Sequence, residues 1–363
     1  MTNLVAEARI KTLAAQAHIV RLCEDLARFE NLGATISPET GRAEFRFGAA
    51  QMIAESDALV LRVEASNEDS LLNLKSILAF RFEELAAEEN PEIIWEGDGC
   101  DATVLPGLRE MRVLASHDVT PHMRRITLRG EDLARFDSHS SHIALLIPPA
   151  GIAVPEWPLP GRNGRMLWPP EPRRPTSRVY TIRNIDAAAG IMDVDFVLHG
   201  DEGIASAWAM RAQPGDIVGI LGPVGRQIPE ADWYVLACDE TGIPAIARIL
   251  EKLPAGVRGH AFIEVADAAE EQRLRCNAAI ETKWLHRNGA EAGTTTLLQD
   301  SVRATAWPSG GRVFAWVGAE GATARALRSY LREERGLDRS QHLGVAYWNR
   351  DSGAGEGMRG SKT

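Results

Sequence analysis

The sequence lacks several features that mark common classes of protein. It has four cysteines, Cys23, Cys100, Cys238 and Cys276, and no C-x-x-C pair. This argues against a disulfide framework or a cysteine-bound iron–sulfur cluster and favours a reducing compartment, so we expect a cytoplasmic protein. No apolar run approaches the roughly 18–20 residues that span a bilayer, and the N-terminus lacks the pattern of a secretory signal. We therefore expect no membrane insertion.

Positive charge is also scarce overall. The chain has 40 Lys and Arg against 50 Asp and Glu, a formal net charge of −10. Residues 1–100 carry nine basic and 18 acidic side chains, a net charge of −9, whereas residues 162–183 carry six arginines and one glutamate, a net charge of +5. The overall acidity argues against a nucleic-acid partner. The local arginines indicate either a solvated loop or an anion site, because Arg binds phosphate and carboxylate bidentately.

Four histidines lie close together in the sequence, but their spacing fits no helical metal motif. They are His117, His122, His139 and His142. We interpret them as ordinary loop or strand residues and assign no metal site.

Residues 1–98 are predicted to form a small acidic α+β domain. Apolar residues recur at helical spacing over 4–29, which predicts a helix there. Residues 43–47 and 58–63 alternate as strands do, and Asn67 is placed to cap a second helix. Nothing in this segment resembles a catalytic constellation.

The next segment, 108–228, is predicted to be an antiparallel β-barrel. Short apolar stretches separated by turn residues are typical of a barrel or a sandwich. The candidate strands are 125–129, 142–147, 178–182 and 192–198. A proline-rich segment at 148–175 interrupts them, and loops of that length inside a domain are usually functional or disordered.

Over residues 229–350 the pattern becomes alternating β and α. An apolar strand at 233–238 is followed by a turn and by a helix that starts near Pro244. This alternation predicts a doubly wound parallel sheet, whose ligands bind beyond the carboxyl ends of the strands. The Gly- and Ser-rich residues 351–363 are predicted to form a flexible tail.

Two motifs in the barrel segment indicate a cofactor site. Residues 178–183 read R-V-Y-T-I-R, so one strand carries a cationic fork, an aromatic ring and a hydroxyl, which suit a ligand with a phosphate and a flat ring. Residues 199–209 read H-G-D-E-G-I-A-S-A-W-A, a strand end and a glycine loop that open a helix. The N–H groups at such a helix start bind pyrophosphate, although a plain capped helix has the same appearance.

With these motifs, the stretch 111–350 resembles the siderophore-interacting proteins, FAD-dependent ferric-siderophore reductases of the ferredoxin–NADP reductase superfamily. Three further stretches carry the resemblance: G-D at 215–216 before the strand that ends in G-P-V-G at 222–225, D-E-T-G-I-P-A-I at 239–246, and Y-W-N-R at 347–350. The sequence departs from the family at Ile204, where proline is frequent, and at Gly242, where alanine is frequent.

The resemblance implies hydride transfer from NADPH or NADH to FAD, followed by single-electron transfer to the Fe(III) of a siderophore. No side chain is assigned as a catalytic acid or base, because the flavin carries the redox chemistry. Tyr180 would pack on the flavin ring, Thr181 would bond near its N5 edge, and Arg178 would meet the pyrophosphate. Either Tyr347 or Trp348 would cover the other ring face. The remaining predicted cofactor residues are Val179, Arg183, His199, Gly203, Ala205, Ser206, Ala207, Trp208, Asp239, Thr241 and Glu264.

The dinucleotide site has less support from the residues. The turn after the strand at 233–238 lacks G-x-G-x-x-G, so no fingerprint for NAD(P)H stands on its own. Glu264 is interpreted either as a ligand of ribose hydroxyls or as a solvated strand end.

Ferric siderophores are often anionic or rich in carbonyl oxygens, so arginines around the flavin strand are candidate substrate residues. They are Arg124, Arg162, Arg165, Arg173 and Arg174. Two other functions stay open: a general flavin reductase component, and a siderophore-binding or shuttling flavoprotein that takes electrons from an external protein donor. A homo-oligomer also stays open. The acidic N-terminal segment resembles a small domain of unknown function that accompanies some members of the family.

Overall fold

The computed structural model describes residues 3–30, 34–37, 39–137, 141–198 and 203–350. Contacts divide the chain into two compact units. Of the described residues, the first contains those up to Leu108 together with Ile152–Pro175, and the second contains Arg109–Gly151 and those from Thr176 to Arg350. Among the described residues, no helix is both long enough and apolar enough to cross a membrane.

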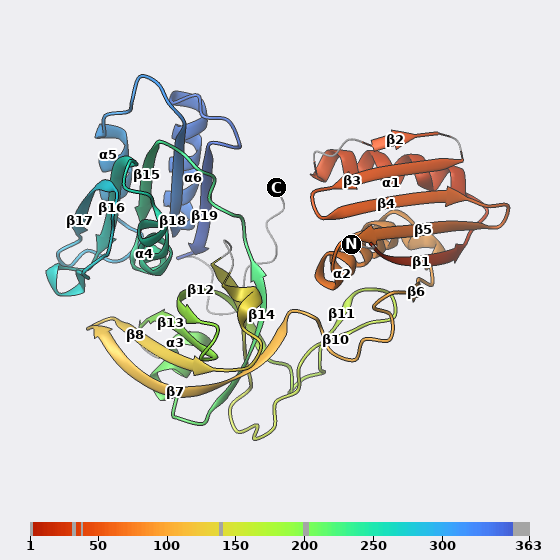
Figure 1. Cartoon of the computed structure of the whole chain (residues 1–363), viewed down its shortest axis with the longest axis horizontal. Coiled ribbons are helices and arrows are strands. Elements are labelled where there is room, and N and C mark those ends of the chain that lie inside the picture. The colour runs from red at the N-terminus through yellow and green to blue at the C-terminus, as the bar shows by residue number, and fades with distance from the viewer. Residues whose placement is uncertain (1–2, 31–33, 38, 138–140, 199–202, 351–363) are drawn as a thin grey trace. The chain divides into compact units, whose positions relative to one another are not determined.

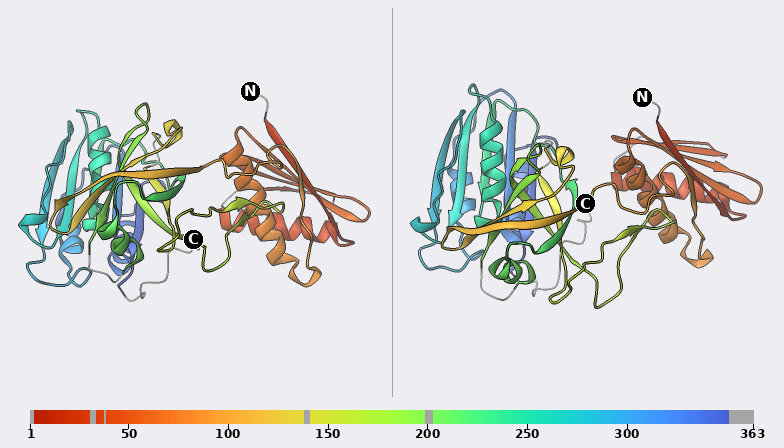
Figure 2. Two further views of the ribbon diagram at one scale, coloured as in Figure 1. Left: turned by 90° about the horizontal axis from the view of Figure 1, so that it is seen from below. Right: turned by 60° about the horizontal axis from the view of Figure 1, so that its bottom comes forward.

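The first unit is built on a six-stranded antiparallel sheet in the order β2-β3-β4-β5-β1-β6 (Figure 1). The strands are β1 Leu4–Lys11, β2 Ala34–Ile36, β3 Thr40–Phe45, β4 Gly48–Ala54, β5 Ala58–Ala65 and β6 Trp95–Gly97. Helices α1 (Ala15–Glu30) and α2 (Glu68–Leu85) pack on the same face of the sheet (Figure 2). Their apolar sides and the sheet share one core, which includes Leu22, Leu61 and Phe82.

The helix predicted from residue 4 is wrong in its first part. Residues 4–11 form β1, in which Ala6, Ala8 and Ile10 are buried and the residues between them are exposed. This period of two satisfies a strand, and β1 pairs with β5 along its whole length. The helix begins only at Ala15.

The other predictions for this domain are confirmed. The strands expected at 43–47 and 58–63 are found as β3 and β5, although β3 ends at Phe45. Asn67 is the N-cap of α2, and its side chain accepts a hydrogen bond from the Ser70 amide at 3.0 Å.

The second unit starts with a closed barrel of six antiparallel strands in the order β12-β13-β8-β7-β14-β9. The strands are β7 Leu108–Thr120, β8 Met123–Arg129, β9 His142–Ile147, β12 Thr176–Asp186, β13 Ile191–Val197 and β14 Ile217–Val224. Apolar side chains such as Ile126, Leu145 and Phe196 fill the barrel, and helix α3 (Ile204–Arg211) adds Ala205 and Ala209 to that core. All four predicted strands are therefore confirmed.

The proline-rich segment leaves the barrel between β9 and β12 and belongs to the first unit. β9 and β12 are paired neighbours, with Thr176 opposite Ile147, so the segment departs from and returns to one end of the barrel. Within it, β10 (Leu159–Pro160) and β11 (Met166–Leu167) form a hairpin. The sequence predicts the length of this insert but not its packing partner.

The rest of the second unit is a parallel sheet of five strands in the order β17-β16-β15-β18-β19. The strands are β15 Trp233–Cys238, β16 Arg258–Val265, β17 Ala279–His286, β18 Val313–Glu320 and β19 His342–Trp348, and the helices are α4 Ile243–Lys252, α5 Leu297–Ala304 and α6 Gly321–Ser329. Leu236 packs in one apolar cluster with α4, and Val235 packs in another with α5 and α6. Helices thus cover both faces, which confirms the doubly wound sheet. The predicted limits 1–98, 108–228, 229–350 and 351–363 stay predictions.

Replacing Asn67 with alanine is expected to lower the free energy of unfolding by about 1 kcal/mol, because one amide of the first turn of α2 loses its acceptor. Urea unfolding measures the change. N67D keeps a side-chain oxygen and is expected to stay close to the wild type; a loss of equal size in N67D would show that the cap is not the cause.

Candidate functional site

Strand β12 carries the first set of predicted cofactor residues. Tyr180 is half-buried, and its ring centroid lies 4.4 Å from that of Phe196 on β13. The Phe196 centroid in turn lies 5.5 Å from that of Trp208 on α3. This aromatic row restricts the orientation of the tyrosine ring. Arg178 is half-buried and donates to the carbonyl of its neighbour Ser177 at 2.9 Å.

Helix α3 begins beside this row with Gly203 as its N-cap, and within the described residues no side chain caps it. Ala205, Ser206 and Ala207 form the first turn and are buried. A helix start without a side-chain cap directs N–H groups and the positive dipole end outward, which suits a pyrophosphate. His199 lies outside the described residues.

Two arginines predicted as ligand contacts join parts of the second unit. Arg183 on β12 reaches the carboxylate of Glu251 on α4 with two bonds, at 2.9 and 3.3 Å. Arg124 on β8 donates to Asp118 at 2.7 Å and to the carbonyl of Met210, near the end of α3, at 3.1 Å. Their roles toward FAD and substrate stay predictions.

The other four predicted substrate arginines lie in the proline-rich segment of the first unit. They are Arg162, Arg165, Arg173 and Arg174. Arg165 donates to Glu83 of α2 at 2.6 Å, and Arg173 is paired with Glu156 at 2.8 Å. Arg174 lies over the indole ring of Trp168, with 5.0 Å to the centroid. Their role as a basic substrate rim stays a prediction.

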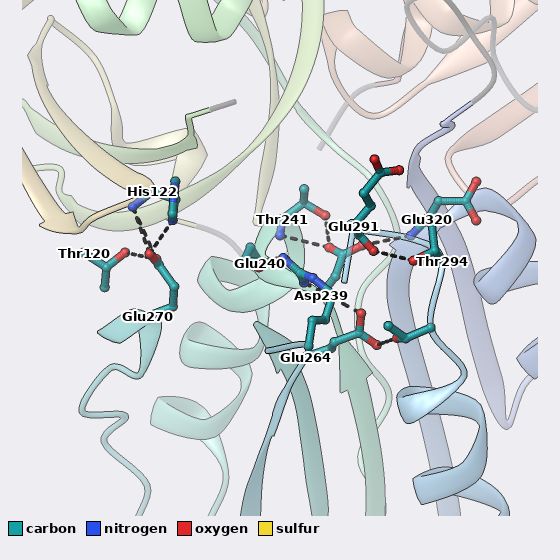
Figure 3. Close-up of polar contacts among 12 residues, drawn as sticks. Thr120, His122, Asp239, Glu240, Thr241, Glu264, Glu270, Glu291, Thr294 and Glu320 are labelled. Carbon is teal, nitrogen blue, oxygen red and sulfur yellow. Dashed lines mark hydrogen bonds and ion pairs between the residues drawn. The ribbon is translucent and has the colours of Figure 1, made fainter. Parts of the chain in front are cut away.

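A second polar group gathers at the carboxyl ends of the parallel strands (Figure 3). Asp239, which follows β15, is buried, and its Oδ2 accepts from the Trp348 indole at 2.8 Å and from the Glu320 amide at 2.9 Å. Its Oδ1 accepts from the Thr241 amide at 2.9 Å. Burial raises the pKa of Asp239 to about 6, although hydrogen bonds from Thr241 and Trp348 act in the opposite direction.

Arg287 links two more carboxylates at this edge. It follows β17, donates to Glu240 at 2.9 Å and lies 3.7 Å from Glu264. Glu264 also accepts from the Thr295 hydroxyl at 2.8 Å and is only 4% exposed, so it is not a solvated strand end. Burial raises the pKa of Glu264. Sequence reasoning missed Arg287 because it missed β17; its place directly after a strand is the signal that could have found it.

Tyr347 joins the barrel to the parallel sheet. Its hydroxyl lies 2.7 Å from Nε2 of His142 on β9 and is also hydrogen-bonded to Thr181, which is buried. Burial, followed by the charge of Arg248, lowers the pKa of His142 to about 4, and burial raises the pKa of Tyr347. Tyr347 therefore contacts β9 and β12, whereas its neighbour Trp348 contacts Asp239.

A second link crosses the same boundary (Figure 3). Glu270, which follows β16, is 2% exposed and accepts from the Thr120 hydroxyl and from the amide and ring of His122. This fits the interpretation of His122 as an ordinary structural residue, and sequence reasoning gave no hint of Glu270. Within the described part of the chain, which excludes His139, no group of three or more His, Cys, Asp or Glu side chains could hold a metal ion.

An antiparallel barrel followed by a doubly wound sheet, with an Arg-Tyr-Thr strand beside a helix start, is an arrangement that suits a flavin-dependent reductase. The family models agree with this class. A siderophore-interacting FAD-binding domain matches residues 112–227, a siderophore-interacting protein matches residues 231–351, and an uncharacterized protein conserved in bacteria, DUF2218, matches residues 7–96. The chain belongs to the siderophore-interacting protein family and carries a DUF2218 domain before the barrel.

Three relatives illustrate the match. A siderophore utilization protein from T. fusca has 41% identity and a TM-score of 0.61, with 69% of this chain and 95% of that chain covered. The ferric vibriobactin reductase ViuB of Vibrio cholerae is 33% identical over 238 residues, which cover 64% of this chain and 86% of the relative. The NADPH-dependent ferric-chelate reductase of Escherichia coli is 32% identical over 249 residues, which cover 66% and 92%.

The wild type is expected to gain stability relative to H142Q as the pH rises from about 4 to 6.5. Folded His142 has a pKa of about 4, below the ordinary 6.5, so in this window the unfolded chain binds more protons and stability rises with pH. The full effect is on the order of 3 kcal/mol. Urea unfolding of both proteins across the window measures it.

The comparison with H142Q is needed because the titration of Asp239 changes the stability in the opposite direction as the pH rises. The pKa of Asp239 is raised from 3.8 to about 6, so the folded chain binds more protons in that range and stability falls as the pH rises. Subtracting the two proteins cancels this contribution. A difference that stays constant across the window would contradict the expectation for His142.

Proposed function

We propose that the chain reduces ferric-siderophore complexes and releases Fe(II), with electrons that pass from a nicotinamide dinucleotide through FAD. The observation that carries the proposal is a barrel of the siderophore-interacting FAD-binding family whose Arg-Tyr-Thr strand lies beside the start of α3. Ferric-siderophore and ferric-chelate reduction are the activities named for two of its relatives. Ferrous iron carries less charge and is softer than ferric iron, so oxygen-rich chelators hold it less tightly.

The residues around β12 fit FAD. Tyr180 would pack against the flavin ring, a contact that contributes about 0.5–1.5 kcal/mol beyond buried area. Arg178 and the amides of the first turn of α3 would hold the pyrophosphate, and the 42% exposure of Val179 shows that this part of the strand reaches the surface. When bound, FAD converts the two electrons of a dinucleotide into the single electrons that Fe(III) accepts.

The neighbouring hydroxyls set the polarity of that ring site. Thr181 is bonded to Tyr347, whose hydroxyl is in turn bonded to His142. Because the pKa of His142 is about 4 and that of Tyr347 is raised, all three groups are uncharged at neutral pH. They therefore orient the Thr181 hydroxyl through hydrogen bonds between neutral groups.

We place the dinucleotide at the carboxyl edge of the parallel sheet, near Asp239, Thr241 and Glu264. Carboxylates of the chain itself already occupy two helix starts at this edge, since Asp239 caps the turn before α4 and Glu320 accepts from the Ala322 amide at 2.6 Å. A pyrophosphate would have to bind beside these starts. This self-capping favours a second candidate function, in which an external protein donor reduces the flavin.

The first expected result concerns FAD affinity. R178A is expected to raise the Kd for FAD by roughly 10- to 100-fold, because a charge-assisted hydrogen bond to phosphate is lost. R183A removes the same side chain from the same strand, but one already bonded to Glu251, and is expected to affect stability more than FAD affinity. Titration of the apoprotein with FAD measures both. An unchanged Kd for FAD in R178A would refute the assignment of Arg178.

The second expected result concerns turnover. Purified protein should show flavin absorption after gel filtration, bleach anaerobically with NADH or NADPH, and then yield Fe(II) from Fe(III)–acetohydroxamate in the presence of a ferrous chelator. Bleaching by dithionite but by neither dinucleotide would favour the external donor. A colourless protein that cannot be reconstituted with FAD would reject the proposed function.

A further inference from the structure

The first unit contains a hairpin that belongs, by sequence, to an insert of the FAD-binding barrel. This hairpin spans residues 159–167 and consists of β10, a tight turn and β11. The turn closes through its own backbone, because the Gly161 amide donates to the Arg165 carbonyl at 2.7 Å and the Gly164 amide donates to the Gly161 carbonyl at 2.8 Å. It lies against α2 and β6 of the DUF2218 domain (Figure 1).

The hairpin covers the edge of the N-terminal sheet. β6 is the last strand of that sheet, and its first residue, Trp95, pairs with Ala8 of β1. The Trp95 amide donates to the carbonyl of Arg162 at 3.0 Å, and its indole Nε1 donates to the carbonyl of Asn163 at 3.1 Å. Exposed sheet edges are templates for unwanted pairing, so this contact also protects the domain.

Helix α2 holds the charged side of the same turn. The carboxylate of Glu83 accepts from Arg165 at 2.6 Å and from the Asn163 amide group at 3.3 Å. The Arg165 guanidinium also lies over the ring of Phe80, 5.5 Å from the centroid. A basic insert thus meets an acidic domain, as the opposite net charges of the two segments suggest.

At Gly164 the backbone of the hairpin packs tightly against α2 and β6. Gly164 has φ +81°, and a Cβ there would lie 2.7 Å from Cβ of Lys75 and 2.9 Å from Nε1 of Trp95. Both neighbours are buried, so neither can move aside freely. The docked position therefore requires glycine for its space as well as for its backbone conformation.

From these contacts we infer that the DUF2218 domain is an intramolecular docking module whose ligand is the hairpin 159–167, and that docking orders the arginine-rich segment that follows the hairpin. Arg173 and Arg174 follow the hairpin and precede the flavin strand. Holding the hairpin removes the conformational freedom of a long insert before substrate arrives. The effect on substrate rests on the proposed function; the docking itself does not.

Docking is tested with two glycine variants of the full chain. Gly164 and Gly151 have nearly equal φ angles, +81° and +82°, but a Cβ at Gly151 would meet nothing within 4 Å. G164A is expected to speed hydrogen–deuterium exchange of the Trp95 amide and of peptides over 159–167 by at least about 10-fold. G151A carries the same backbone strain and is expected to leave both unchanged. Unchanged exchange in G164A, or equal effects of the two variants, would overturn the docking.

A charge swap tests the ion pair of the same contact. E83R and R165E should each speed exchange over the hairpin, and the double variant should restore slower exchange because the pair is re-formed in reverse. If the double variant recovers no protection, the ion pair between Glu83 and Arg165 does not contribute to the docking. FAD content of each variant reports whether the barrel is folded.

The positioning effect is measured with Fe(III)–acetohydroxamate as substrate. G164A is expected to raise KM about 3- to 10-fold at low salt with kcat nearly unchanged, because the arginines lose their placement and not the flavin its environment. An unchanged KM despite faster exchange would overturn the positioning role. If the wild type reduces no ferric complex at all, the proposed function fails, while the exchange result still decides the docking.

Discussion

The hydrogen bond between Tyr347 and His142 is the contact on which the geometry of both candidate sites depends. It crosses from the last strand of the parallel sheet to the barrel, and Thr181 of the flavin strand shares it. Arg183 to Glu251 and Arg248 to the Ile182 carbonyl hold α4 against the same stretch of β12. One strand therefore carries the residues proposed to bind the flavin and also anchors the parallel-sheet domain. A shift of the sheet relative to the barrel would displace Thr181, which is proposed to lie near the flavin ring.

The hydrogen bonds at Thr181 join neutral groups, whereas the carboxyl edge of the parallel sheet holds several carboxylates. A buried ion pair gains little net stability, because desolvation offsets attraction, whereas removing one partner leaves a costly buried charge. Asp239, Glu240, Glu264 and Glu320 are buried, and each is held by amides, hydroxyls, an indole or Arg287. The edge is consequently rigid and already satisfied. The proposed dinucleotide would therefore have to bind surface that these carboxylates leave free.

Much of this could be predicted from the sequence, for physical reasons that differ between elements. Alternation and turn residues sufficed for β8, β9, β12, β13 and β15, and Asn67 revealed its own cap, because these signals are local. The helix expected from residue 4 failed because Ala6, Ala8 and Ile10 recur with the period of a strand, and β1 pairs with β5 along its whole length. The contacts of Arg287 and Glu270 and the partner of Arg183 could not be predicted. They depend on the strand order, which brings together residues far apart in the chain. The docking of the insert depends on the same kind of long-range contact.

The charges of the insert and of the N-terminal domain are opposite, yet charge alone cannot specify their contact. Arg165 and Glu83 are 46% and 28% exposed, and a pair of that kind contributes about 0–1 kcal/mol. Any of the acidic side chains of the domain could offer as much. The specific part is uncharged: the Trp95 amide and indole fit two successive carbonyls, and Gly164 fits a space that excludes a methyl group. Opposite charge favours the association of the two segments, whereas backbone geometry determines the position at which the hairpin docks.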